Sequence, residues 1–346
     1  MSTPVNFFDL SFSELEDVVS NLGQPSFRAK QIWKGIYQSY WASPSNFSNI
    51  PLDFRYKLEE YFSFYNLVPQ TNLSSNDHKT YKYLFRLPDS QAIETVRMDY
   101  DKRHTLCIST QVGCAMNCSF CATGQMGFNR NLTSGEMVEQ MLFFSRDLAK
   151  SGAKVTNIVL MGMGEPFLNY ENVIKAIDTL NDPQGLNFGE RRFTLSTVGI
   201  IPIIRRFTDE HRQINLAISL HAPYDELRSS MLPINKKYPV AELLEACHNY
   251  VSATHRRITF EYALVDGVND ADSTARDLAL LLKGLICHVN LIPLNPTSSF
   301  NGNGSSIDTA DRFSKILNQS GITATVRLRR GIDIHAGCGQ LASSLK

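Results

Sequence analysis

The sequence predicts an α/β fold in which a partial (β/α) barrel follows a small helical domain and a β-hairpin. Three patterns along the chain support this prediction. Residues 1–64 show helical periodicity, residues 65–100 alternate with a period of two, and residues 101–346 repeat apolar runs followed by amphipathic segments. Repeated β-then-α units are typical of a parallel sheet, and their number favours a barrel over one dinucleotide-binding half. We interpret the three segments as an accessory domain, a linker and a barrel that ends in a cysteine-containing loop.

The accessory domain carries a helix-start signal and a basic amphipathic stretch. Ser13 and Glu16 have the spacing of a capping box, and residues 27–37 mix apolar and basic positions. Lys30 and Lys34 in that stretch are candidate phosphate contacts, and solvated surface lysines explain them equally well.

The linker is predicted from alternation of aromatic and charged residues. Tyr81, Tyr83 and Phe85 alternate with Lys82, and Pro88-Asp89-Ser90 has turn chemistry. A β-hairpin is therefore expected between the accessory domain and the barrel.

Seven apolar runs predict the strands of the barrel: 106–110, 155–161, 193–197, 214–220, 258–265, 289–294 and 324–328. Helical segments are predicted to begin at Thr133, as a capping box with Glu136, and at Asn169 or Tyr170, with others over 240–252 and 306–319. The active site of such a barrel is built at the carboxyl ends of its strands.

Cys114, Cys118 and Cys121 lie within eight residues and directly follow the first barrel strand, with no fourth cysteine beside them. Three cysteinates can hold three irons of a four-iron cubane and leave the fourth iron open for a substrate. This spacing therefore predicts a catalytic iron–sulfur cluster. The alternatives are a zinc knuckle without a neighbouring histidine and three unrelated buried thiols.

Polar residues follow several other predicted strands. Gly164 and Glu165 lie in a Gly-rich turn whose amides and carboxylate could bind a polar ligand, although an ordinary βα turn explains the glycines nearly as well. Ser196, Ser219, His221 and Asn295 occupy comparable positions. Taken one at a time, each of these residues could simply cap the end of a strand. Several of them around one barrel mouth indicate the lining of a pocket for a polar ligand.

Two further cysteines have contrasting surroundings. Cys338 is flanked by glycines, which gives its sulfur the accessible backbone that a nucleophile needs. Cys107 lies on the first barrel strand and by itself is typical of a core thiol, as are Cys247 and Cys287.

Overall charge gives no indication of a nucleic-acid partner, because 34 Lys and Arg match 34 Asp and Glu. Basic doublets at 191–192, 205–206, 236–237, 256–257 and 329–330 would line a polyanion-binding face if the fold gathers them, and solvated charges explain them equally well.

The cell compartment is predicted from the N-terminus and the cysteine count. No basic segment followed by an apolar core begins the chain, and no apolar run is long enough to span a membrane. Seven cysteines, an odd number, favour reduced thiols over a disulfide framework. We therefore expect a cytoplasmic protein without a membrane partner.

These motifs together resemble the RlmN/Cfr family of radical S-adenosylmethionine RNA (adenine) methyltransferases, and within it the RlmN branch. The resemblance covers nearly the whole chain and rests on 93–96, the cysteine triplet with 122–124, 161–166, 195–197, 219–221 and 337–341. It implies a radical-SAM barrel with a [4Fe-4S] cluster on the three cysteines. It also implies S-adenosylmethionine contacts at Gly164, Glu165, Ser196, Ser219, Leu220, His221 and Asn295.

The resemblance further implies catalytic roles for three residues. Cys338 would accept a methyl group from one S-adenosylmethionine, and a second molecule would supply the radical that activates this methyl, so two are used per turnover. Cys107 would release the product through a transient disulfide with Cys338, and Glu94 would accept a proton.

The expected substrate is carbon 2 of adenosine 2503 in 23S rRNA, together with the adenine 3′ of the anticodon in some tRNAs. An accessory domain that binds RNA and an electron donor such as flavodoxin are implied as well. Three alternatives stay open: Cfr-like methylation at carbon 8, a non-catalytic iron–sulfur module that binds RNA, and an activating enzyme for a glycyl radical. The last gives no reason for the Cys107 and Cys338 pair. Ile332 and His335 depart from the commonest RlmN pattern.

Overall fold

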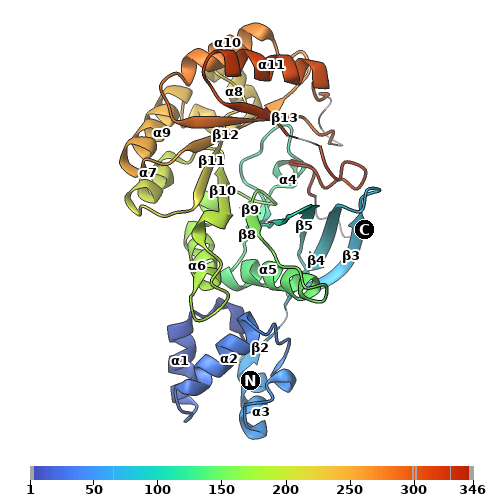
Figure 1. Cartoon of the computed structure of the whole chain (residues 1–346), viewed down its shortest axis with the longest axis vertical. Coiled ribbons are helices and arrows are strands. Elements are labelled where there is room, and N and C mark those ends of the chain that lie inside the picture. The colour runs from blue at the N-terminus through green and yellow to red at the C-terminus, as the bar shows by residue number, and fades with distance from the viewer. Residues whose placement is uncertain (1–3, 65, 298–299, 301, 328, 343–346) are drawn as a thin grey trace.

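The computed structural model describes residues 4–64, 66–297, 300, 302–327 and 329–342. The N-terminal helices form one end of an elongated molecule, and the large sheet with its covering helices forms the rest (Figure 1). Within the described residues, no helix combines the length and the apolar character needed to cross a bilayer.

The N-terminal region contains three helices around a cluster of aromatic rings. The elements of this region are β1 (Val5–Asn6), η1 (Phe7–Asp9), α1 (Phe12–Asn21), α2 (Phe27–Tyr37), η2 (Pro44–Asn46), α3 (Leu52–Tyr61) and β2 (Phe62–Ser63). Trp33 is fully buried, and its ring centroid lies 5.6 Å from that of Phe12 and 4.4 Å from that of Tyr37. Ring contacts of this kind stabilise a small core beyond the area that they bury.

The capping box of α1 lies two residues earlier than predicted. Ser11 is the N-cap, and it exchanges hydrogen bonds with Glu14 in place of the predicted pair Ser13 and Glu16. The prediction was wrong because both pairs have the required spacing, and the choice depends on packing. Starting the helix at Phe12 buries that side chain against the aromatic cluster.

A ten-stranded sheet forms the body, in the order β14-β13-β12-β11-β10-β9-β6-β5-β4-β3. Its strands are β3 (Val68–Ser74), β4 (Thr80–Arg86), β5 (Ala92–Tyr100), β6 (Arg103–Cys107), β9 (Asn157–Leu160), β10 (Phe193–Thr197), β11 (Asn215–Ser219), β12 (Ile258–Leu264), β13 (Cys287–Pro293) and β14 (Ala324–Val326). The seven strands β6 and β9–β14 are parallel neighbours and correspond to the seven predicted runs. The sheet has two free edges, β14 and β3, so the barrel is partial.

The segment predicted as a hairpin holds three antiparallel strands, β3, β4 and β5, and the last of these pairs with β6. The segment therefore extends the main sheet as well as connecting the two regions. One face of this extension packs on α5 (Ser134–Ala149), where Tyr83 and Phe85 meet Phe143 and Phe144 edge to face.

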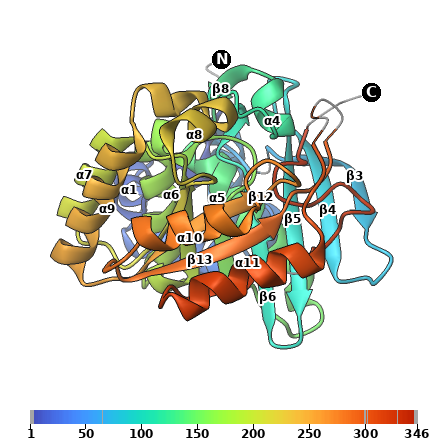
Figure 2. The same ribbon diagram turned by 90° about the horizontal axis from the view of Figure 1, so that it is seen from above.

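The remaining helices lie along the outer side of the parallel strands (Figure 2). They are α5 (Ser134–Ala149), η3 (Pro166–Leu168), α6 (Tyr170–Asn181), η4 (Glu190–Arg192), α7 (Ile201–Asp209), α8 (Asp225–Met231), η5 (Pro233–Lys236), α9 (Val240–Thr254), α10 (Asp272–Leu281) and α11 (Ile307–Gln319). Thr133 caps α5 through the predicted capping box with Glu136. The apolar sides of these helices and of the sheet form one continuous core.

Glu139 on α5 joins the N-terminal region to the sheet. Its carboxylate accepts hydrogen bonds from the side chain of Asn6, from the amides of Asn66 and from the backbone N–H of Leu67. Burial raises the pKa of Glu139, and the bonds from Asn66 oppose that shift. A buried polar group satisfied in this way fixes the angle between the two parts.

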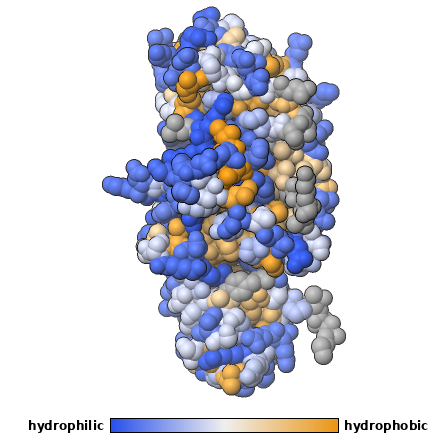
Figure 3. Space-filling view, turned by 90° about the vertical axis from the view of Figure 1, so that its right-hand side faces the viewer, coloured by the Kyte–Doolittle hydropathy of each residue, from blue (hydrophilic) through white to orange (hydrophobic). Residues whose placement is uncertain are grey.

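The chain after β14 covers the open side of the partial barrel. Arg327 reaches across to the sulfur of Met98 on β5, and Arg330 donates to the carbonyl of Asp99 at 3.2 Å while its guanidinium stacks over the ring of Tyr100. The side of the molecule seen in Figure 3 is mainly hydrophilic, with hydrophobic side chains in small separate groups.

Candidate active site

The three neighbouring cysteines lie on a loop that is held at its base by a short antiparallel ladder. The ladder pairs β7 (Gln111–Gly113) with β8 (Phe128–Asn131), and the loop between them contains α4 (Ala122–Gln125). Gly113 has a φ of +74°, and a Cβ at this position would lie 1.9 Å from the carbonyl oxygen of Gly127. Only glycine allows the two ends of the loop to approach so closely.

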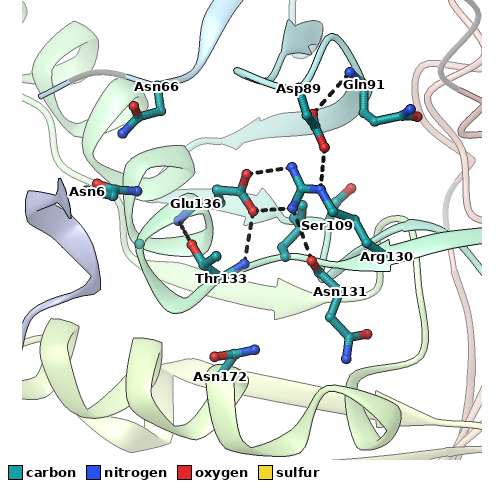
Figure 4. Close-up of polar contacts among 12 residues, drawn as sticks. Asn6, Asn66, Asp89, Gln91, Ser109, Arg130, Asn131, Thr133, Glu136 and Asn172 are labelled. Atoms are coloured by element: carbon teal, nitrogen blue, oxygen red, sulfur yellow. Dashed lines mark hydrogen bonds and ion pairs between the residues drawn. The ribbon is translucent and has the colours of Figure 1, made fainter. Parts of the chain in front are cut away.

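Arg130 lies on β8, directly after this loop, and forms ion pairs with two other elements (Figure 4). Its two terminal nitrogens each donate to one oxygen of Glu136 at 2.8 Å, and its Nε donates to Asp89 in the turn between β4 and β5. Glu136 also accepts from the backbone of Thr133, so the α5 capping box and the arginine share one carboxylate. Bidentate pairs of this kind are the stronger class of ion pair.

Cys114, Cys118 and Cys121 line one cavity, which we call the cysteine cavity. Its other polar or reactive lining residues are Gly164, Glu165, Ser196, Thr197, Ser219, His221, Glu261, Asn295 and Cys338. Burial raises the pKa of Cys114 to about 12 and that of Cys118 well above its ordinary value, so iron binding to either thiol would displace a proton.

The arrangement of the three thiols is compatible with an iron–sulfur cluster. Among the described residues, no three His, Cys, Asp or Glu side chains come close enough together to hold one metal ion. A cubane bound by three cysteinates has each sulfur on a different iron, so its ligands stand around a cavity and do not converge on one point. The three thiols surround a shared cavity in this way.

Glu165 is held as a buried hydrogen-bond acceptor at the carboxyl end of β9. One carboxylate oxygen accepts from the backbone of Phe167 at 3.0 Å, and the other from Val198 at 2.9 Å. Burial raises the pKa of Glu165 to about 7 despite these bonds. Gly164 has a φ of +104°, and a Cβ there would meet Gln111 at 2.6 Å, so packing requires this glycine whether or not its amide meets a ligand.

His221 lies in the cavity wall as a neutral ring. Its Nδ1 accepts the backbone N–H of Ala263 at 2.9 Å, and burial lowers the pKa of His221 to about 3. With Nδ1 used as an acceptor, the proton resides on Nε2. The ring packs edge to face with Phe120 of the cysteine loop at 5.0 Å, so the strand end and the loop support one another.

Arg228 is buried and ties together the ends of β10 and β11. Its guanidinium donates to the backbone carbonyls of Val198, Ser219 and Leu220. Leu220 is fully buried, does not line the cavity, and also uses its N–H on the carbonyl of Glu261. The predicted cofactor contact at Leu220 therefore stays a prediction, whereas Ser196 and Ser219 do face the cavity.

Asn295 shows that the cysteine cavity is suited to a polar ligand. Its Nδ2 donates to the carbonyl of Cys338 at 3.2 Å, but its Oδ1 is buried and has no hydrogen-bond partner among the described residues. Buried acceptors are nearly always paired in native proteins, by protein, water or ligand. The cavity therefore holds an unsatisfied acceptor as well as the Glu165 carboxylate, and an ammonium, amino or hydroxyl group suits both. S-adenosylmethionine carries all three groups.

A second cavity, which we call the thiol-pair cavity, is lined by Cys107, Cys338, Met98, Arg327 and Asn295 among other residues. Cys107 ends β6, where it pairs with Val159 of β9. Burial raises the pKa of Cys107 to about 12 and also raises that of Cys338. Both cysteines are free thiols, and the two cavities share Cys338 in their walls.

The segment that carries Cys338 is bound directly to the cysteine loop. The N–H of Ala122 donates to the carbonyl of Gly339 at 2.8 Å, and the hydroxyl of Thr123 donates to that of Leu341 at 2.7 Å. Gln340 donates to the carbonyl of Pro296 on the other side. The position of Cys338 therefore depends on the conformation of the loop with the three cysteines.

Glu94 does not line either of these cavities. It lies in a third one, beside Lys82, His335 and Gln340, where it forms an ion pair with Lys82 at 3.0 Å. Its second oxygen accepts the N–H of Ala342 at 2.9 Å. Burial raises the pKa of Glu94 and the Lys82 charge opposes that shift. The structure thus separates Glu94 from the two thiols by the C-terminal segment.

Three members of the basic doublets come together elsewhere. Arg191, Arg256 and Arg257 line a surface hollow at the starts of β10–β12, and Arg256 is fixed there by the side chain of Gln213. Arg206 is instead paired with Glu171 and Glu210. The doublets are therefore not gathered on one face: Arg206 is used in local ion pairs, and Arg329 and Arg330 line the thiol-pair cavity.

Two functional candidates were missed by the sequence reasoning, Arg327 and Glu261. Arg327 lies inside the predicted run 324–328, where a charged residue in a strand run was the available signal, and only the structure shows that β14 ends one residue before it. Glu261 lies within the strand run 258–265, and a carboxylate in an otherwise apolar strand was the available signal.

Comparisons with known proteins identify the family to which this chain is related. Residues 108–279 match the sequence model of the radical SAM superfamily, and residues 5–63 match that of the ribosomal RNA large subunit methyltransferase N-terminal domain. The chain is 44% identical over 97% of its length to the probable dual-specificity RNA methyltransferase RlmN of Dictyoglomus thermophilum, covering 96% of that protein. It is 46% identical over 97% of both chains to the protein of the same name from Caldanaerobacter subterraneus subsp. tengcongensis. The crystal structure of a radical SAM methyltransferase from Sphaerobacter thermophilus superposes with a TM-score of 0.97 at 48% identity, covering 99% of this chain and 100% of that one.

Proposed function

Because the chain belongs to the RlmN family of radical SAM RNA methyltransferases, we propose that it methylates carbon 2 of an adenine in RNA through a methylated Cys338. The observation that carries this proposal is the position of Cys338, which lines both the cysteine cavity and the thiol-pair cavity. A methyl carrier has to meet the methyl donor on one side and the thiol that later releases it on the other.

The residues around the cysteine cavity are suited to bind the two cofactors that the family uses, a [4Fe-4S] cluster and S-adenosylmethionine. Cys114, Cys118 and Cys121 would hold the cluster, and the acceptors on Glu165 and Asn295 would bind polar groups of the methyl donor. When bound, the pair supplies a 5′-deoxyadenosyl radical, which can remove a hydrogen atom from carbon where polar alkylation fails. Neutral His221 adds a hydrogen-bond donor without adding positive charge near a sulfonium.

Cys338 acts first as a nucleophile and then as the carrier. In its thiolate form it attacks the methyl carbon of one S-adenosylmethionine and becomes a thioether. A hydrogen atom is then removed from the S-methyl group at the expense of a second S-adenosylmethionine, and the remaining methylene adds to the adenine. Two molecules are therefore used in each turnover.

Cys107 would release the product. Its thiolate would attack the sulfur of Cys338, so that a disulfide forms between the two residues while the carbon–sulfur bond to the product breaks. The unpaired electron left by the addition to adenine would return to the cluster that supplied it. Burial at the end of β6 keeps Cys107 protonated until that step. Glu94 would accept a proton, and because it lines a different cavity from the two thiols, this role requires the C-terminal segment to shift.

For the substrate we propose adenosine 2503 of 23S rRNA and, in some tRNAs, the adenine 3′ of the anticodon. An adenine has to leave its stack to reach a buried carrier, and RNA loops allow this most easily. We assign RNA binding to the accessory domain 1–64, with 65–100 as the connection and 101–346 as the catalytic part. A flavodoxin-like electron donor and a cytoplasmic location complete the proposal.

The test is anaerobic incubation of the reconstituted protein with S-adenosylmethionine and either 23S rRNA or tRNA, followed by nucleoside mass spectrometry. We expect 2-methyladenosine. Formation of 8-methyladenosine would replace the carbon-2 assignment by Cfr-like chemistry. Absence of both, with no 5′-deoxyadenosine and no change of the cluster's EPR signal on adding S-adenosylmethionine, would favour a non-catalytic RNA-binding module.

A further inference from the structure

Arg327 is a buried cation whose side chain contacts sulfur. Its Nη1 lies 3.9 Å from the Sγ of Cys338, and its Nη2 lies 3.9 Å from the Sδ of Met98. Both hydrogen bonds that its side chain makes to described residues therefore end on sulfur. A buried guanidinium ordinarily pairs with a carboxylate or phosphate in a fork. A neutral thiol and a thioether are weak partners for it.

The backbone fixes where this guanidinium can lie. The N–H of Arg327 donates to the carbonyl of Leu291 at 2.8 Å, which continues the pairing of β14 with β13 by one residue. The side chain therefore starts from an ordered strand end and points into the thiol-pair cavity, whose wall it forms together with Cys107 and Cys338. A residue on a strand end is more precisely placed than one on a loop.

Glu261 is the second anion near Arg327. It lies on β12, is almost fully buried, faces the cysteine cavity, and accepts a hydrogen bond from Asn290 of β13 at 2.7 Å. Burial by itself would lower the pKa of Arg327, but the attraction of Cys338 and Glu261 raises it. The charge of Arg327 also opposes the rise that burial causes in the pKa of Glu261.

Several groups around the Cys338 thiol shift its pKa. Burial, Glu261 on β12 and Cys121 on the cysteine loop all raise the pKa of Cys338, whereas Arg327 lowers it. Cys107 on β6 is a further acidic thiol, and a charge on Cys338 raises its pKa. Arg327 is thus the cation that favours the thiolate against the other influences.

We propose that Arg327 is a catalytic residue of the methyl-accepting step, in which its guanidinium pairs with the Cys338 thiolate. This inference rests on the proposed function and deepens it. In the step, the Cys338 sulfur gives an electron pair to the methyl carbon of the sulfonium. The new carbon–sulfur bond forms as the old one breaks, and neutral S-adenosylhomocysteine leaves. The negative charge on Cys338 and the positive charge on the sulfonium both disappear.

The interaction between Arg327 and Cys338 is lost after methylation and restored at the end of the cycle. Once Cys338 is a neutral thioether, its sulfur no longer carries a charge that attracts Arg327. The charge of Glu261 is then the main one that acts on the arginine. The arginine then has no charge interaction with the carrier that would oppose the movement of the S-methyl group toward the substrate. When Cys107 has released the product and an external dithiol has reduced the disulfide, the Cys338 thiolate again attracts Arg327.

The experiment measures the reactivity of Cys338 without using methyl transfer. Full-length protein with unmodified Cys338, verified by mass, is reconstituted anaerobically and treated with iodoacetamide at several pH values, and alkylation of the Cys338 peptide is followed by mass spectrometry. We expect Arg327→Gln to slow alkylation about tenfold at neutral pH, because an adjacent opposite charge shifts a pKa by about one to three units. Arg327→Lys should recover part of the rate.

Glu261→Gln separates electrostatics from loss of structure. Removing this anion should speed alkylation of Cys338, the opposite direction from Arg327→Gln, whereas general loosening would change both variants in the same direction. Arg312→Gln, which removes an exposed arginine of α11 paired with Asp272, is the matched control and should leave the rate unchanged. Equal alkylation rates in the wild type and Arg327→Gln would overturn the proposal.

Methylation of Cys338 by S-adenosylmethionine is measured in parallel on the same proteins. A wild type that never methylates Cys338 would refute the proposed function while leaving the alkylation result valid. A wild type and an Arg327→Gln variant that methylate Cys338 at equal rates would refute the role of Arg327 and leave the proposed function standing.

Discussion

Asn295 and Cys338 are joined by a hydrogen bond from the Asn295 side-chain amide to the Cys338 backbone carbonyl, with 3.2 Å between the two atoms. The bond links the end of β13 to the C-terminal segment. The other polar atom of the same side chain, Oδ1, is buried and unpaired among the described residues. One residue therefore binds the backbone of Cys338, the proposed methyl carrier, and carries an unpaired acceptor in the wall of the cysteine cavity.

Asn295→Ala is expected to weaken binding of S-adenosylmethionine about tenfold, since a hydrogen bond to a charged or strongly polar ligand contributes about 1.5–3 kcal/mol. Equilibrium binding to the anaerobically reconstituted protein measures this, with iron content checked in the same samples. Asn318→Ala, which removes an amide at the end of α11, is the control. An unchanged affinity in Asn295→Ala would show that the unpaired oxygen does not meet the ligand.

Cys107→Ala is expected to leave methylation of Cys338 intact and to trap a covalent adduct between protein and RNA. The reason is that the carbon–sulfur bond of the adduct lacks the thiol that breaks it. Denaturing gel electrophoresis with labelled RNA detects the adduct, and Cys247→Ala, which removes a fully buried thiol outside both cavities, is the control. Normal turnover by Cys107→Ala would rule out the resolving role.

Cys338→Ala is expected to cleave S-adenosylmethionine to 5′-deoxyadenosine without transferring a methyl group. The three proposed cluster ligands are untouched, and only the proposed carrier is missing. Chromatography of the small products and mass spectrometry of the RNA give both readouts from one reaction. Methylated RNA from this variant would refute the carrier mechanism.

Glu165 predicts a pH dependence of stability for the ligand-free protein. Its folded-state pKa of about 7 lies above the ordinary value of 4.5, so the folded state binds the proton more tightly than the unfolded state. This contribution to stability is fully present below about pH 4.5 and is lost as the pH rises to about 7, a loss of roughly 3 kcal/mol. Urea unfolding at a series of pH values measures it.

Glu165→Gln should remove this slope, even though the amide leaves one backbone N–H without an acceptor and so lowers stability at every pH. The comparison therefore uses the slope of the free energy of unfolding against pH and not its absolute value. A variant with the slope of the wild type would show that the buried carboxyl does not titrate in this range.

Lys82→Met tests the environment of Glu94. Without the ammonium group, the buried Glu94 loses the cation that opposes its desolvation, so its pKa should rise further and its carboxylate form should become scarcer near neutral pH. Methyl transfer should fall several-fold at pH 6 and recover as the pH is raised. Loss of activity that is equal at every pH would mean that Lys82 acts only on structure.

Much of the fold was predictable because it depends on local patterns. The seven parallel strands have apolar runs bounded by turns, and the box of Thr133 with Glu136 has the expected spacing. The prediction of a helix start from sequence failed where two residues had the same capping-box spacing. Ser11 and Ser13 both lie three residues before a glutamate, and the burial of Phe12 selects the first.

The sequence by itself determined the chemistry that is available: three closely spaced thiols, a Gly-rich turn with a carboxylate, and a cysteine between glycines. Only the tertiary structure decided which groups share a cavity. It placed Arg327 beside Cys338 and across from Met98, 229 residues away in the chain, and it paired Glu94 with Lys82 and Ala342. The physical reason is that the sheet curves and the C-terminal segment returns across its open side. Contacts made by such a return depend on the whole fold and leave no local periodicity in the sequence.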